Sequence, residues 1–191
     1  MKFRTAGQKK GWIFAMKTRL GPLVIGLKFH GSNVYMTTED IRELPAEDLS
    51  KAAAAIQLLE TAVVSGRPRV EDSPYSAADR IVLATSLVAW SAGLTGLGRW
   101  DEALEALEEA RSHYFWVGTR GGFKFDGTIG QRLALVYYNA ARIHWILHNR
   151  EAATGQLHSA RQNLARLNPK YLEGAEVVVE AVTDLGLFLD M

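Results

Sequence analysis

From about residue 45 onward, apolar residues recur every three or four positions, the spacing of helices with one buried face. Residues that favour turns or helix ends interrupt this pattern at Gly66 and Pro68, near Gly98 and at Asn149. Ser76, with Asp79 three positions later, is typical of a helix start. The pattern therefore predicts separate helices over about 45–66, 76–98, 99–114, 131–147, 150–168 and 169–190.

The first 37 residues have a different pattern. They are rich in β-branched and aromatic residues, and Leu20-Gly21 precedes Pro22 at a plausible turn. We expect a small β hairpin or meander here, forming a β-rich arm over 1–37.

The segment 113–127, "HYFWVGTRGGFKFDG", combines five large aromatic residues with several glycines. We interpret it as a hairpin inserted over 113–128, with Gly121 and Gly122 at its tip. Because aromatic side chains are costly to leave in water, we expect it to be ordered and at least half buried. It could cover the helical core as a lid, bind a partner protein, or stack on a nucleic acid.

The helices between 76 and 166 form two pairs, each with a very short internal turn. Short turns force the two helices of a pair to be antiparallel. The second helix of each pair has the same small-large-small pattern, Ala103, Leu107 and Ala110 in one and Ala153, Leu157 and Ala160 in the other. Such alanines allow close approach of helices.

These pairs resemble the tetratricopeptide repeat. The family pattern falls on Leu87, Trp90, Ser91, Leu94, Ala103, Leu107 and Phe115, and again on Tyr137, Ala140, Ala141, His144, Ala153, Leu157 and Ala165. The sequence departs from the family because both prolines are missing, His144 replaces a packing tyrosine, and Ala153 follows Ala103 by 50 residues rather than 34.

The resemblance implies a mostly α fold of tandem antiparallel helix pairs, capped by the helices at 45–66 and 169–190. It also implies a groove, lined by the first helix of each pair, that receives a peptide or helix of a partner. Tyr138, Arg142 and Trp145 share one helix face and are our candidates for this groove.

Composition narrows the class of protein without naming a function. The chain has 191 residues, 48% apolar and 23% charged, as expected for one soluble globular domain over 1–191. It has no cysteine, which excludes disulfides and thiolate chemistry. Its apolar runs are shorter than the roughly 18 residues that span a bilayer, so we expect a cytoplasmic protein.

Charge is distributed unevenly. Residues 1–38 contain seven Lys and Arg residues and no acid, including Lys9, Lys10, Lys17 and Arg19, although the whole chain has a net charge of +1. Such a basic arm could bind nucleic acid, an anionic surface, or the acidic helices of its own chain.

Motifs for catalysis are missing from the sequence: it has no P-loop, dinucleotide fingerprint, nucleophile elbow or zinc-protease helix. His144 and His148 have a spacing that can hold a metal on one helix face, but the sequence offers only His158 as a third ligand. Adjacent acids such as Asp101 and Glu102 are typical of a solvated helix face. We therefore predict no catalytic residue, metal or cofactor.

The sequence favours a non-catalytic protein–protein interaction module: an adaptor, a chaperone-like subunit, or a component of a larger complex or homo-oligomer. The candidate partner-binding residues are Tyr138, Arg142, Trp145, Trp116, Arg120 and Phe123. The alternative is a nucleic-acid-associated protein that uses the basic arm.

Overall fold

The computed structural model describes residues 25–29, 32–36, 46–120, 127–167 and 176–189. The predicted arm up to residue 24, with Lys9, Lys10, Lys17 and Arg19, lies outside the described residues, as do Gly121, Gly122 and Phe123. The described part of the chain contains two short strands and six helices, which pack in sequential pairs. The prediction of a mostly α protein is confirmed.

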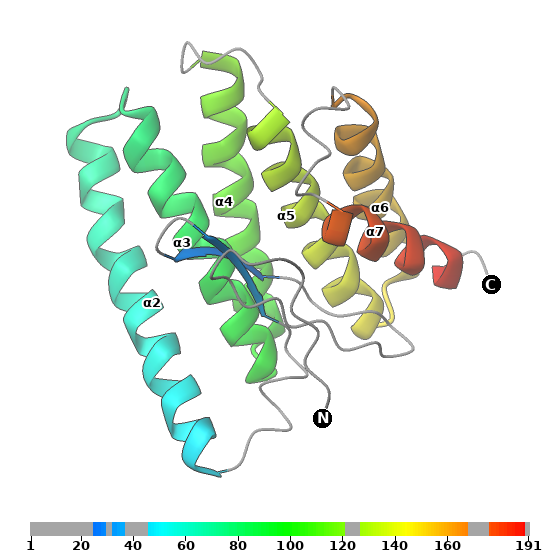
Figure 1. Cartoon of the computed structure of the whole chain (residues 1–191), viewed down its shortest axis with the longest axis horizontal. Helices are drawn as coiled ribbons and strands as arrows, with labels where there is room; N and C mark the ends of the chain where they lie inside the picture. Colours follow the sequence, from blue (N-terminus) through cyan, green and yellow to red (C-terminus); the bar gives the residue numbers. More distant parts are fainter. Residues whose placement is uncertain (1–24, 30–31, 37–45, 121–126, 168–175, 190–191) are drawn as a thin grey trace.

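The elements follow one another along the chain in the order shown in Figure 1. They are β1 (Ile25–Phe29), β2 (Ser32–Met36), α2 (Ala46–Asp72), α3 (Ala77–Gly96), α4 (Trp100–Arg120), α5 (Gly127–Ile146), α6 (Arg150–Ala165) and α7 (Glu176–Leu189). The two strands are antiparallel, with Ile25 opposite Met36 and Phe29 opposite Ser32.

The middle four helices form two pairs, and the helices of the second pair begin a constant number of residues after those of the first. Helices α3 and α5 each have 20 residues and begin at Ala77 and Gly127, 50 positions apart. Helices α4 and α6 begin at Trp100 and Arg150, again 50 positions apart. The described residues therefore contain two consecutive helix–turn–helix pairs whose helices begin at matching positions.

The turns within the two pairs have the same backbone structure. Gly98 and His148 occupy equivalent positions and have positive φ angles of 75° and 59°. In each turn two N–H groups bond back to carbonyls near the end of the first helix, the Schellman arrangement. The bonds run from Gly98 to Thr95 (3.0 Å) and Arg99 to Leu94 (2.9 Å), and from His148 to Trp145 (3.0 Å) and Asn149 to His144 (2.8 Å). The predicted helix breaks near Gly98 and Asn149 are confirmed.

The start of α3 was also predicted from the sequence. Ser76 is its N-cap, and the Ser76 hydroxyl accepts a hydrogen bond from the Asp79 N–H at 3.2 Å. By contrast, the predicted end of the first helix at Gly66 and Pro68 is wrong, since α2 continues to Asp72. Gly66 instead allows close packing: a Cβ there would lie 3.1 Å from Cδ1 of Leu83.

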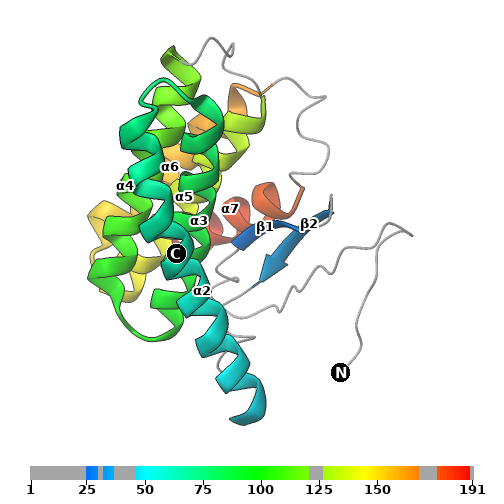
Figure 2. The same ribbon diagram turned by 90° about the vertical axis from the view of Figure 1, so that its left-hand side faces the viewer.

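Helices α2 to α6 lie side by side, and α7 and the two strands lie on one side of them (Figures 1 and 2). Strand β1 contacts α3, and α7 contacts both α5 and α6. The core is formed by side chains that are almost fully inaccessible, among them Leu83, Leu87, Ala103, Leu107, Ala110, Leu133, Ile143, Ala153, Leu157, Ala160 and Leu185. Both small-large-small patterns predicted from the sequence face this core.

Helix α3 is long and apolar enough, by composition, to cross a membrane. Half of its most apolar window is buried, because α3 packs between α2 and α4. A core helix of this kind has the same composition as a membrane span.

Candidate partner-binding site on helix α4

The first part of the aromatic and glycine segment is helical. Helix α4 continues to Arg120, so the predicted hairpin is wrong for residues 113–120. Tyr114 and Val117 are buried and continue the stripe that begins with Ala103. Their three- and four-residue spacing keeps them on the core face of one helix, which outweighs the turn preference of the neighbouring glycines.

The opposite face of α4 is exposed along its whole length. We call this face, together with the exposed Arg120 beside its carboxyl end, the α4 ridge. The exposed residues along the face itself are Asp101, Glu105, Glu108, Ser112, Phe115 and Thr119. They alternate at spacings of four and three, so they form one continuous line along the helix. Phe115 is 54% exposed, unusually high for a phenylalanine.

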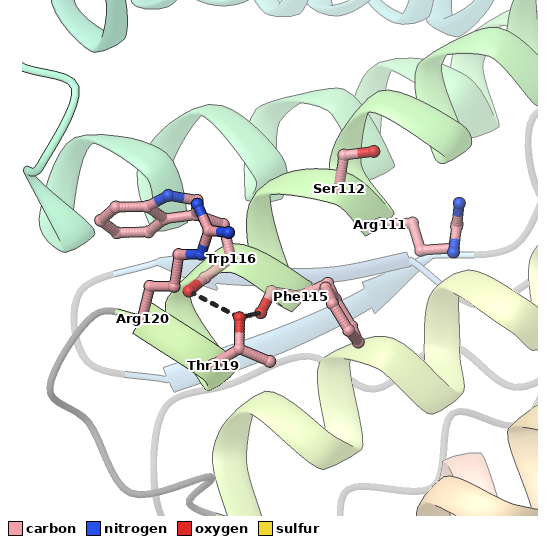
Figure 3. Close-up of a pocket in the computed structure, with 6 residues that line it drawn as sticks. All are labelled: Arg111, Ser112, Phe115, Trp116, Thr119 and Arg120. Atoms are coloured by element: carbon pink, nitrogen blue, oxygen red, sulfur yellow. Dashed lines mark hydrogen bonds between the residues drawn. The ribbon is translucent and has the colours of Figure 1, made fainter.

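A pocket of about 380 Å³ lies at the carboxyl end of the α4 ridge (Figure 3). It is lined by Arg111, Ser112, Phe115, Trp116, Thr119 and Arg120. Two of the residues predicted from the sequence, Trp116 and Arg120, therefore come together here. Phe115 and Arg111 were not predicted as site residues, although the helical spacing places them beside Trp116.

Trp116 is held in place by Arg80 of α3. The Arg80 guanidinium lies 4.3 Å from the centre of the indole ring, a cation–π contact. Arg80 is itself fixed, because it donates hydrogen bonds to the Pro74 carbonyl at 2.9 and 3.1 Å. The indole thus forms a preorganised wall of the pocket.

A chain of polar contacts connects this wall to α2. Arg80 Nη1 lies 3.1 Å from Nδ1 of His113, and His113 Nε2 lies 3.9 Å from a Glu109 carboxylate oxygen. Glu109 in turn accepts two hydrogen bonds from Arg67 of α2, at 2.6 and 2.9 Å. Burial lowers the pKa of His113, and nearby Arg80 lowers it further, whereas Glu109 opposes this effect.

The arginines of the pocket differ in how they are paired. Arg111 forms a bidentate ion pair with Glu108, and this hydrogen bonding raises the pKa of Arg111. Arg120 is exposed and makes no hydrogen bond or ion pair with any described residue. Its guanidinium lies beside Trp116, where it is available to an anionic group (Figure 3).

The second helix pair has no counterpart of these aromatic residues. The residue 50 positions after Phe115 is Ala165, and the residue 50 positions after Trp116 is Arg166. Helix α6 ends at Ala165, whereas α4 continues for the equivalent of five more residues. The aromatic end of α4 is therefore specific to the first pair.

The candidates for a groove on α5 are less accessible than the resemblance implies. Tyr138 is fully buried and Arg142 is 3% exposed, while Trp145 is partly buried. The equivalent residues of α3, Val88, Ala92 and Thr95, are buried as well. Neither Tyr138 nor Arg142 is open to a partner in this conformation, so their role in binding stays a prediction.

A smaller hollow of about 180 Å³ lies between the two helix pairs. Its lining includes Leu104, Arg111, Tyr137, His144 and Gln156. Because Arg111 borders both hollows, the accessible surface is continuous from Leu104 to Arg120 along α4.

The histidine pair considered as a metal site does not share a helix face. Helix α5 ends at Ile146, so His148 lies in the following turn while His144 remains in the helix. Burial lowers the pKa of His144. The described residues contain no cluster of three or more potential metal ligands.

Comparisons of the chain with protein families, curated proteins and solved structures find no match.

Proposed function

We propose that this protein is a non-catalytic protein-interaction module, acting as an adaptor, a chaperone-like subunit or a component of a larger assembly. Its framework would be a tetratricopeptide-like array with a small N-terminal β element. The observation that supports the proposal is the pocket at the end of α4, which is lined at the surface by Phe115, Trp116 and Arg120. Tryptophan and arginine are the residue types that most often dominate the energy of protein interfaces.

The preorganisation of the pocket also supports a binding role. Trp116 is already fixed by Arg80, so a partner would not have to immobilise the indole on binding. The equivalent positions of the second pair are Ala165 and Arg166, so these aromatics are not part of what the two helix pairs share. A partner would thus meet the outside of the array rather than the buried face of α5.

Affinity capture with Trp116→Ala tests this function. The matched control is Arg166→Ala, which changes the exposed residue at the equivalent position of the second pair. We expect the wild type and the control to retain specific proteins, and the Trp116 variant to lose them while it remains folded, with a melting temperature lowered only by the loss of the Arg80 contact and of packing against the core. Equal capture by all three proteins would contradict a site on α4.

Nuclease treatment of the same extracts distinguishes protein binding from the alternative function, nucleic-acid binding. Retention that disappears after nuclease treatment, and that falls steeply between about 50 and 200 mM salt, would indicate nucleic-acid binding. Binding in an aromatic pocket should depend much less on salt.

A further inference from the structure

The α4 ridge has opposite charges at its two ends. Between Trp100 and Ala110 the helix contains five acids and no base, whereas residues 111–120 contain two arginines and no acid. Acids near the amino end and bases near the carboxyl end also complement the helix dipole. The dipole does not, however, explain why Phe115 is exposed in this basic part of the helix.

Three of the ridge charges have no partner among the described residues. Asp101, Glu105 and Arg120 are exposed, and no hydrogen bond or ion pair within the described chain involves them. By contrast, Glu108 is paired with Arg111 and Glu102 with Arg99. The open charges therefore lie at both ends of the ridge and are of opposite sign.

This arrangement is complementary to a second copy of itself. If two α4 helices lie antiparallel about a twofold axis near Ala110, the acidic end of each meets the basic end of the other. Asp101 then falls next to Arg120 of the second copy, and Leu104 falls next to Phe115, which lies on the same side of the ridge. Since an isologous contact repeats every pairing twice, both ends are satisfied together.

We propose that the α4 ridge is a twofold contact between two copies of this chain. Arg120 of one copy binds Asp101 of the other, and the exposed Phe115 packs against Leu104 of the second copy. Leu104 is partly buried and borders the hollow between the helix pairs, so part of its side chain is available. This inference rests on the proposed function, because it names a second copy as a partner at the same site.

A second copy fits the ridge better than a partner of one charge sign. An acidic peptide would bind Arg120 but would be repelled by Asp101 and Glu105, and a basic peptide would meet the reverse problem. The helix has 21 residues and is thus about 30 Å long. Both ends can be matched only by a surface that changes sign over the same length.

Charge exchange tests the contact in the full-length protein. Sedimentation or light scattering over a dilution series should give the wild type a mass of twice 21.1 kDa. Arg120→Glu and Asp101→Arg should each be monomers of 21.1 kDa, because each places like charges at both pairs. Mixing the two variants should restore the dimer, since every pair in the mixed dimer again joins opposite charges.

The control is Arg166→Glu, a change at the exposed residue that caps the end of α6, which should leave the dimer intact. Both ridge positions are exposed, so melting temperatures can verify that the variants fold. A monomeric wild type at all concentrations, or two monomeric variants that do not associate on mixing, would overturn the inference. If a monomeric wild type still captured proteins through Trp116, the proposed function would stand and the second copy would be the wrong partner.

Discussion

Two glycines inside helices have opposite surroundings. A Cβ on Gly93 of α3 would lie 2.6 Å from Cγ1 of Ile56, whereas a Cβ on Gly155 of α6 would meet nothing within 4 Å. We expect Gly93→Ala to lower the free energy of unfolding by about 1–3 kcal/mol, because it forces α2 and α3 apart. Gly155→Ala should raise the free energy of unfolding by about 1 kcal/mol, since alanine favours the helix. Urea denaturation measures both; an unaffected Gly93→Ala would show that the two helices are not in close contact there.

The paired turns allow a second comparison at single residues. Gly98 and His148 both have a positive φ, yet only glycine adopts it without steric cost. We expect Gly98→Ala to lower the free energy of unfolding by about 1–2 kcal/mol. His148→Gly should raise the free energy of unfolding or leave it unchanged. Relief of backbone strain stabilises the folded protein, whereas glycine also makes the unfolded chain more flexible, which opposes this gain. Thermal melts would check this, and a clear loss in His148→Gly would indicate a stabilising role for the imidazole.

At the scale of elements, helix α4 shows what the sequence does and does not predict. The alanine and leucine stripe correctly places Ala103, Leu107 and Ala110 in the core. The hairpin prediction is wrong because the helical period continues through Tyr114 and Val117 and outweighs the turn preference of the glycines. Once 113–120 is helical, the spacing alone brings Trp116 and Arg120 to one face. The cation–π wall from Arg80 depends on packing between helices and has no local signal.

The contacts between α2, α3 and α4 predict a dependence of stability on pH. The pKa of His113 is lower in the folded protein than its ordinary value of 6.5, so the unfolded chain binds more protons below that pH. The groups facing His113 are Arg80 and Glu109, with Arg67 beyond them. Stability should therefore fall as the pH drops from above 6.5 towards the folded-state pKa.

Chemical denaturation at about pH 7.5 and about pH 5.5 would measure this dependence. His113→Gln should make it shallower, because the substitution removes one group that takes up a proton on unfolding. His158→Gln is the control, since His158 is exposed on α6. An identical pH dependence in wild type and His113→Gln would contradict the proposed linkage.

At the scale of the whole molecule, the sequence predicts the helix pairs better than what surrounds them. Helix periodicity and short turns are local properties, and both pairs follow from them. The position of α7 against α5 and α6 depends on contacts between residues far apart in the chain. Tyr138 and Arg142 share a polar and aromatic helix face, which in the sequence is typical of an open groove. Tertiary packing nevertheless buries both side chains.

Tandem construction predicts that the two halves of the molecule open separately. Contacts within each helix pair are more extensive than those between α4 and α5, so a defect in one pair should spread only weakly to the other. Leu87 of α3 and Leu157 of α6 are both buried, and replacing either with alanine should cost about 2–5 kcal/mol. In native-state hydrogen exchange, Leu157→Ala should accelerate exchange mainly in α5, α6 and α7, and Leu87→Ala mainly in α2, α3 and α4. Uniform acceleration across all six described helices in both variants would mean that the pairs unfold as one cooperative unit.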